Sequence, residues 1–165
     1  MSRVFNLDCD PLNGVFSYNP EETERLKEKN YAEVSIDDLR QIALWKIDRV
    51  INVEDDVLDL LRKLSKQESL TAGRQCIDAL IQCEGVGYPM ASTILKFIRP
   101  DVFPIIDVRA YRALTGQKMQ SSQYTTDIYL DYVARLNKIA AVRKIPLSEV
   151  DEQLYCFDKT HNGKI

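Results

Sequence analysis

Two glycines separated by a single residue, Gly85 and Gly87, mark the most informative stretch of this sequence. They follow an apolar helical pattern and precede Tyr88-Pro89, where proline suits the start of a helix because its missing N–H would be unpaired there. We therefore expect a tight hairpin between two helices, with Pro89 at the first position of the second helix. The N–H groups at that helix start favour an anion such as phosphate. The alternative is an ordinary turn that needs glycine only for its backbone conformation.

Asp107 is the second residue whose type and position could do chemistry. Residues 101–106 predict a short extended connector, and the helical pattern resumes after Asp107 and continues to Leu114. A carboxylate at this point could stabilise positive charge on a sugar or orient an attacking water. Aspartate is also favoured as the N-cap of a helix, and a cap would fix the position of the carboxylate. Both roles are therefore open for Asp107.

The order of these motifs resembles the helix-hairpin-helix DNA glycosylase superfamily, the relatives of endonuclease III and of the 8-oxoguanine and adenine glycosylases. Its members share a glycine hairpin, a helix with small residues near its start, a short loop and a catalytic aspartate. Here Gly85-Val86-Gly87, Ala91 and Pro104-Ile105-Ile106-Asp107-Val108-Arg109 fall in that order. The chain also resembles small bacterial members without an assigned activity, in which a pair like Trp45-Lys46 recurs.

The resemblance implies a monofunctional base-excision N-glycosylase that binds duplex DNA through the hairpin, with Asp107 as the catalytic residue. The residues expected to contact DNA belong to the hairpin and to the basic positions near it: Gly85, Val86, Gly87, Tyr88, Met90, Lys96, Arg109 and Arg112. For the basic residues, a solvated helix face is the alternative. The resemblance also implies a monovalent cation, Na⁺ or K⁺, held by main-chain carbonyls of Ile81, Cys83 and Val86. A non-catalytic helix-hairpin-helix module that binds DNA or a protein partner is the alternative function.

Three departures from the family narrow what this chain can do. Bifunctional members carry a lysine nucleophile two residues after the second hairpin glycine, and this position is Pro89 here, which has no amine for a Schiff base. The histidine that often follows the aspartate by two residues is replaced by Arg109. The four-cysteine iron–sulfur motif is missing, because only Cys156 lies in the C-terminal region. We expect no lyase activity through a hairpin lysine and no iron–sulfur cofactor.

A base-flipping enzyme also needs aromatic or apolar groups that hold the extruded base. Tyr88, Trp45 and Tyr111 are the candidates, although each is of a type that more often belongs to a core. For Trp45 we expect packing in the core, with the neighbouring Lys46 facing a cleft. The cysteines are far apart and the single histidine, His161, lies in a polar tail, so a zinc site is not expected.

Helical periodicity runs through almost the whole chain after an irregular N-terminal arm at residues 1–20. We expect an all-α fold, a compact globule of about seven to eight helices in a single domain over residues 1–165. The helix-hairpin-helix would span residues 71–99, and the loop and helix with the candidate catalytic Asp would span 100–115. Individual helices are predicted after an N-cap at Ser35, at 57–64, 71–83, 89–99, 107–114 and 126–144, and after an N-cap at Ser148. On the helix at 89–99, we expect Ser92, Lys96 and Arg99 to face outward.

The formal net charge of −3 over 165 residues argues against a general nucleic-acid binder, which usually carries a basic excess. The charge is uneven, however: residues 1–61 hold 7 basic and 14 acidic side chains, whereas residues 85–118 hold 5 basic and 2 acidic ones. DNA affinity is therefore expected to be modest and local. The sequence has neither a run of about 18 apolar residues nor a secretory signal. We expect no membrane partner and a cytoplasmic protein with four reduced thiols.

Overall fold

The computed structural model describes residues 2–66 and 70–165, and within these residues it contains eight α-helices, one short 3-10 helix and no strand. This confirms the prediction of a compact all-α fold. The elements are α1 (Pro20–Lys27), α2 (Ile36–Ile47), α3 (Asp55–Ser65), α4 (Leu70–Leu80), α5 (Tyr88–Ile98), α6 (Val108–Thr115), η1 (Ser121–Gln123), α7 (Thr126–Arg143) and α8 (Leu147–His161). Over the same residues, no helix is long and apolar enough to cross a membrane.

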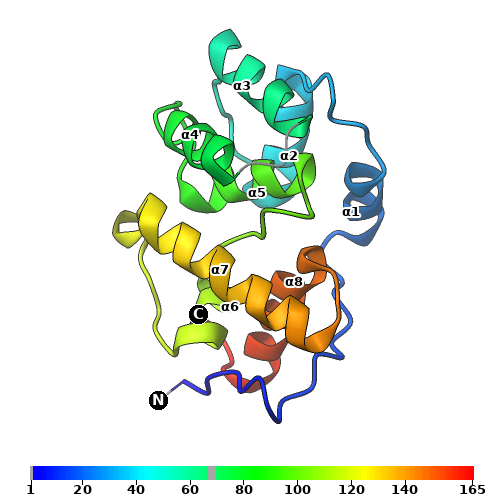
Figure 1. The fold of residues 1–165 in the computed structure, drawn as a ribbon, viewed down its shortest axis with the longest axis vertical. Coiled ribbons are helices and arrows are strands. Elements are labelled where there is room, and N and C mark those ends of the chain that lie inside the picture. Colours follow the sequence, from blue (N-terminus) through cyan, green and yellow to red (C-terminus); the bar gives the residue numbers. More distant parts are fainter. Residues whose placement is uncertain (1, 67–69) are drawn as a thin grey trace.

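The helices form two groups that meet at mid-height of the molecule. Helices α2 to α5 make one half, and α6 to α8 make the other half (Figure 1). Residues 2–19 contain no helix and run along the second half, where the Arg143 guanidinium donates to the main-chain oxygens of Leu7 and Asp10. Gln153 on α8 exchanges two hydrogen bonds of 2.9 Å with the backbone of Gly14. The N-terminal arm is thereby fixed to α7 and α8.

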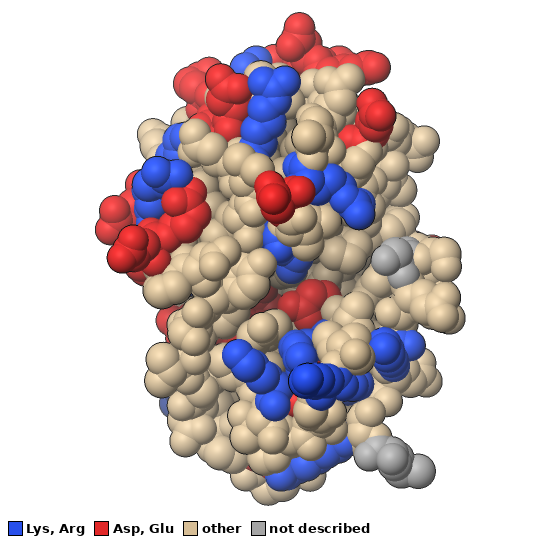
Figure 2. All heavy atoms as spheres, turned by 180° about the vertical axis from the view of Figure 1, so that it is seen from behind, with Lys and Arg blue, Asp and Glu red and all other residues tan. Residues whose placement is uncertain are grey.

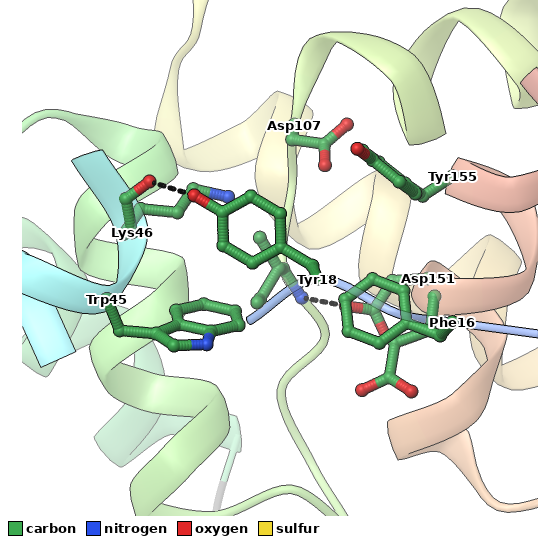
Figure 3. Close-up of a pocket in the computed structure, with 9 residues that line it drawn as sticks. Phe16, Tyr18, Trp45, Lys46, Asp107, Asp151 and Tyr155 are labelled. Atoms are coloured by element: carbon green, nitrogen blue, oxygen red, sulfur yellow. Dashed lines mark hydrogen bonds between the residues drawn. The ribbon is translucent and has the colours of Figure 1, made fainter. Parts of the chain in front are cut away.

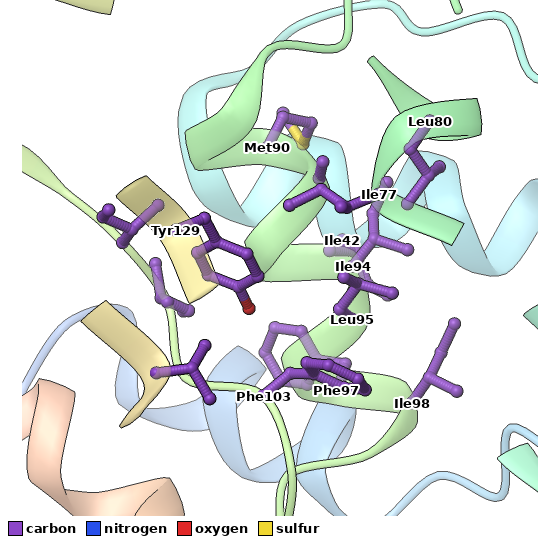
Figure 4. Close-up of a cluster of buried hydrophobic side chains, with 14 of the residues drawn as sticks. Ile42, Ile77, Leu80, Met90, Ile94, Leu95, Phe97, Ile98, Phe103 and Tyr129 are labelled. Carbon is purple, nitrogen blue, oxygen red and sulfur yellow. The ribbon is translucent and has the colours of Figure 1, made fainter. Parts of the chain in front are cut away.

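Helix α5 lies at the centre of the molecule and is buried along its length from Met90 to Ile98. Figure 4 shows apolar side chains from α2, α4, α5 and α7 gathered around it. The expectation that Ser92 and Lys96 face outward is therefore wrong, since they are 0% and 4% exposed. The physical reason is that residues 103–106 cover the polar side of α5, where the Ser92 hydroxyl accepts the Ile106 N–H at 3.1 Å.

The helix ends follow local capping signals with two differences from the sequence prediction. Ser35 caps α2 as expected, and its partner Asp38 accepts the Ser35 N–H at 2.8 Å. Ser148 does not cap α8, because that helix begins at Leu147 and its N-cap position is Pro146. Pro89 is the second helical residue of α5, rather than the first. These shifts of one or two residues leave the positions of the helices unchanged.

Candidate active site

A cavity of about 190 Å³ lies where the two groups of helices meet. Its walls come from the N-terminal arm, the end of α2, the connector before α6, and α8 (Figure 3). The lining residues are Phe16, Tyr18, Trp45, Lys46, Ile105, Asp107, Asp151, Glu152 and Tyr155. This volume suits one small ring system rather than a large ligand.

Asp107 takes both of the roles that its type and position allow. Its backbone is extended (φ −126°, ψ 168°), and one carboxylate oxygen accepts the Ala110 N–H at 2.8 Å, so Asp107 is the N-cap of α6. The other oxygen has no hydrogen-bond partner among the described residues, and the carboxylate lines the cavity. Figure 3 shows the Tyr155 hydroxyl pointing toward it. The cap therefore fixes a carboxylate whose second oxygen is left for another group.

Lys46 lies on the opposite wall, one residue before the end of α2, and its side chain is half-buried. Within the described residues its amino group has neither a hydrogen bond nor an ion pair. Burial lowers the pKa of Lys46, and nearby Asp107 and Asp151 act in the opposite direction. The expectation that Lys46 faces a cleft is confirmed.

The other charges beside the cavity neutralise one another. The Lys96 ammonium bonds to both oxygens of Asp151 at 2.8 and 2.9 Å and to Glu152 at 3.0 Å. Asp151 also accepts the Ile105 N–H at 3.0 Å, and Glu152 pairs with Lys27 at 3.2 Å. Burial raises the pKa of Asp151, and Lys96 opposes that rise. Two cations and two carboxylates are thus paired, and among the described residues that line the cavity the charges without an ion pair are Lys46 and Asp107.

Four aromatic rings and Ile105 form the apolar part of the walls. Phe16 meets Tyr155 edge to face with ring centroids 5.8 Å apart, and Tyr18 meets Trp45 in the same way at 5.1 Å. The Tyr18 hydroxyl donates to the main-chain oxygen of Lys46 at 2.8 Å, which fixes the arm against α2. Trp45 packs in the core as expected, but it also lines the cavity.

The hairpin between α4 and α5 contains two glycines with different structural requirements. Gly85 has φ +79°, and a Cβ atom there would lie 2.5 Å from the main-chain oxygen of Val50, so the fold requires glycine. Gly87 is exposed with φ −107°, and a Cβ there would meet nothing closer than 4.0 Å. The fold itself therefore gives no reason for glycine at position 87, which is the N-cap of α5.

Two of the basic residues expected to contact DNA lie in the interior, which corrects that prediction. Lys96 belongs to the ion cluster described above, and Arg112 forms a bidentate pair of two 2.8 Å bonds with Asp158. Arg112 is 6% exposed and Asp158 is 0% exposed. Arg109 pairs with Asp158 at 3.2 Å and lies over the Tyr155 ring, but its side chain keeps 18% of its surface exposed. Of the three, Arg109 has the most surface left for a phosphate.

The remaining sequence candidates divide between surface and core. Met90 and Val86 are buried, whereas Tyr88 is half-buried and hydrogen-bonds Thr126 at 3.1 Å. Tyr111 packs on two other tyrosines rather than on the cavity. Tyr88 and Tyr111 are both outside the cavity wall, so they do not hold a ring bound there.

The predicted cation ligands lie in the hairpin turn. Among the described residues, the carbonyl oxygens of Ile81 and Val86 accept no backbone hydrogen bond, and that of Cys83 accepts the Val86 N–H at 3.2 Å. Because a carbonyl oxygen has two lone pairs, all three keep the capacity to bind a monovalent cation. Such a cation would add positive charge beside the N-terminus of α5. In the described part of the chain, histidine, cysteine and acidic side chains form no group of three that could hold a metal ion.

Comparison of this chain with known proteins found no relative. No family model, no curated protein and no solved structure matches the chain. The function must therefore be argued from the cavity itself.

Sequence reasoning placed Asp107, Trp45 and Lys46 near a site, but it missed the other walls. Phe16 and Tyr18 belong to an arm without periodicity, and Asp151, Glu152 and Tyr155 belong to the last helix. The aromatic residues of α8 are the available local signal. Nothing in their spacing indicates contact with residues more than a hundred positions earlier.

Proposed function

We propose that this chain is a DNA glycosylase-like hydrolase that cleaves the N-glycosidic bond of a base in duplex DNA. The observation that carries the proposal is the position of Asp107, which is fixed by capping α6 and has its second oxygen open to a small, aromatic-lined cavity. Cleavage at C1′ of a deoxyribose builds positive charge on the sugar. A fixed carboxylate stabilises that charge or orients the attacking water.

The cavity walls are consistent with an extruded base. Aromatic groups hold a flipped base by stacking, and Phe16, Tyr18, Trp45 and Tyr155 offer their rings here. A base held by these rings would bring its sugar close to Asp107 and Lys46, which line the same cavity. The ammonium form of Lys46 would also attract the flanking phosphate.

Two surface features support DNA as the carrier of the base. The N-cap of α5 is an exposed glycine with open space in front of it, which permits close approach of a phosphate to the helix N-terminus. Figure 2 shows Lys and Arg side chains on both halves of this face, but on the half that contains α6 and α8, below a hollow at mid-height, few acidic side chains accompany them. Acidic side chains concentrate on the opposite half (Figure 2), so the net charge of −3 does not describe this face.

The test is release of a base from a panel of duplexes that each contain one damaged or mismatched base. The wild-type chain is compared with Asp107→Asn, in which asparagine keeps the helix cap but removes the negative charge. We expect release to fall about a hundredfold or more. The matched control is Asp131→Asn, an exposed carboxylate on α7 without a hydrogen bond or ion pair in the described residues. No release from any duplex, or equal release by Asp107→Asn, would overturn the proposal.

A non-catalytic module that binds DNA or a protein partner is the second candidate, favoured by Pro89 in place of the hairpin lysine and by the net charge of −3. Gly87 provides the discriminating experiment. Gly87→Asp adds a negative charge where a phosphate would lie, and Gly87→Asn is its uncharged match, since both residues suit an N-cap. A module predicts salt-dependent duplex binding that Gly87→Asp weakens and Gly87→Asn retains, with no base release by the wild-type chain.

A further inference from the structure

We propose that the Tyr155 hydroxyl donates a proton to the base as it leaves the sugar and regains a proton from Asp107 afterwards. The inference rests on the proposed function, because it assigns the proton donor for the same bond cleavage. A base that leaves with the electron pair of its bond becomes more basic, and a positioned acid accelerates that step. Helix α8, which brings Tyr155 to the cavity wall, thereby takes part in the reaction.

The first support is a contrast among the aromatic residues of the cavity, three of which carry a hydrogen-bond donor. The Trp45 ring N–H donates to the Thr23 hydroxyl at 2.8 Å, and the Tyr18 hydroxyl donates to the main-chain oxygen of Lys46 at 2.8 Å. The Tyr155 hydroxyl has no hydrogen-bond partner among the described residues, although its side chain is half-buried and lines the same cavity. Because such donors usually have a partner, this hydroxyl is the one left for a ligand.

The second support is that neighbouring side chains fix the Tyr155 ring. Phe16 meets it edge to face with ring centroids 5.8 Å apart, and the Arg109 guanidinium lies over it at 5.8 Å from the centroid. Arg109 is itself held by Asp158 at 3.2 Å and by the main-chain oxygen of Gly163 at 2.8 Å. The hydroxyl is therefore presented to the cavity in one direction, as a proton donor must be.

The third support is the carboxylate that this hydroxyl faces. Figure 3 shows the Tyr155 hydroxyl pointing toward Asp107. One oxygen of Asp107 accepts the Ala110 N–H, and the other has no partner among the described residues. A carboxylate that takes a proton from water can pass it to a nearby oxygen, directly or through one water. Asp107 is therefore placed to restore the Tyr155 hydroxyl after each reaction.

The reaction balances without an oxidant or a reductant. As the C1′–N bond breaks, its electron pair goes to the base nitrogen, which takes the phenolic proton of Tyr155. The oxygen of a water molecule bonds to C1′, and that water gives one proton to the Asp107 carboxylate. The Asp107 carboxyl group then gives this proton to the Tyr155 phenolate. The base leaves with one added hydrogen, the sugar keeps a hydroxyl, and both side chains regain their starting states.

The first experiment measures single-turnover base release from the duplex panel by the wild-type chain and by Tyr155→Phe. Phenylalanine keeps the ring and its stacking contacts but lacks the hydroxyl, so release should slow at least about tenfold. Tyr111→Phe is the matched control, because Tyr111 lies outside the cavity wall and its hydroxyl has no hydrogen bond among the described residues. This control should release the base at the wild-type rate. Equal release by Tyr155→Phe and the wild type would overturn the proposal.

A second experiment separates proton donation from a structural role of the hydroxyl. Difluorotyrosine at position 155 keeps the ring and the hydroxyl, but fluorine makes the hydroxyl more acidic, so it loses its proton at lower pH. We expect base release by this variant to decline with rising pH while the wild type is still active. Difluorotyrosine at position 111 should keep the wild-type pH profile. Identical profiles for the wild type and the variant at position 155 would rule out Tyr155 as the donor.

The outcomes distinguish this proposal from the proposed function. Base release that Tyr155→Phe retains overturns the proton donor and leaves the glycosylase function in place. No release from any duplex by the wild-type chain overturns both. Urea unfolding shows whether Tyr155→Phe keeps the stability of the wild type; if it does not, the pH profile of the difluorotyrosine variant, which retains the hydroxyl, decides.

Discussion

Two lysines approach the centre of the molecule from neighbouring helices, and their surroundings give them different roles. Lys96 on α5 is enclosed by carboxylates and serves to hold α8 against the central helix. Lys46 on α2 enters the same region without a partner among the described residues. A charge that the fold has paired contributes to structure, whereas a charge that the fold leaves unpaired at a cavity is available for a ligand. The hairpin glycines show the same contrast, because the fold requires Gly85 and does not require Gly87.

The largest effect is expected when the paired lysine, Lys96, is replaced. Lys96→Met should lower the free energy of unfolding by about 3–5 kcal/mol, because it leaves buried Asp151 without its partner. Lys46→Met should change it by less than about 1 kcal/mol, since no pairing is lost. Urea unfolding of both variants against the wild type measures the difference. Equal losses for the two variants would show that Lys46 is structural.

The hairpin contrast predicts an intermediate effect. Gly85→Ala should cost about 1–3 kcal/mol of stability because it forces a non-glycine residue to φ +79° and toward the Val50 oxygen. Gly87→Ala should be nearly neutral in the same thermal or urea unfolding experiment. A large loss for Gly87→Ala would mean that the glycine serves the fold after all, and would remove the argument for close approach of a ligand.

The two roles of Asp107 can be separated by comparing two substitutions. Asp107→Ala removes the cap of α6 and should cost about 1 kcal/mol, whereas Asp107→Asn should retain most of that stability. Both should remove base release. A pair of unfolding curves combined with the glycosylase assay tests this, and activity retained by either variant would contradict the catalytic role.

The smallest expected effect is on the pH dependence of stability. The pKa of Lys46 is lowered in the folded protein from its ordinary value of 10.5, so the unfolded chain binds more protons between the two values. By linkage, this site increases the free energy of unfolding as the pH rises through that interval. Lys46→Met lacks this contribution, whereas the neighbouring charges of Asp107, Asp151 and Lys96 are present in both proteins. Parallel stability profiles in alkaline solution would contradict the lowered pKa.

Much of the fold could be predicted because amphipathic stripes are local signals. The stripe of Val57, Leu61 and Leu64 corresponds to the buried face of α3, and the Ser35 cap marks the start of α2. For α5 the prediction was wrong, because its polar residues Ser92 and Lys96 suggested a face exposed to solvent. They are polar because they serve partners inside the protein: Ser92 bonds the connector and Lys96 bonds α8.

The candidate site was predictable only in part for a similar reason. Asp107 stands at a boundary between an extended segment and a helix, which is visible in the sequence. Its partners across the cavity come from the N-terminal arm, α2 and α8, and their convergence depends on how the two groups of helices meet. No periodicity records such distant contacts.

The arm that carries Phe16 and Tyr18 has an evolutionary consequence. A wall of the cavity is built by a segment that contains no helix and contributes few residues to the hydrophobic core. Substitutions there can reshape the chamber while the helical scaffold and the carboxylate at its edge stay in place. Descendants of such a protein could acquire new substrate preferences through changes in about twenty residues, without first having to redesign their interior.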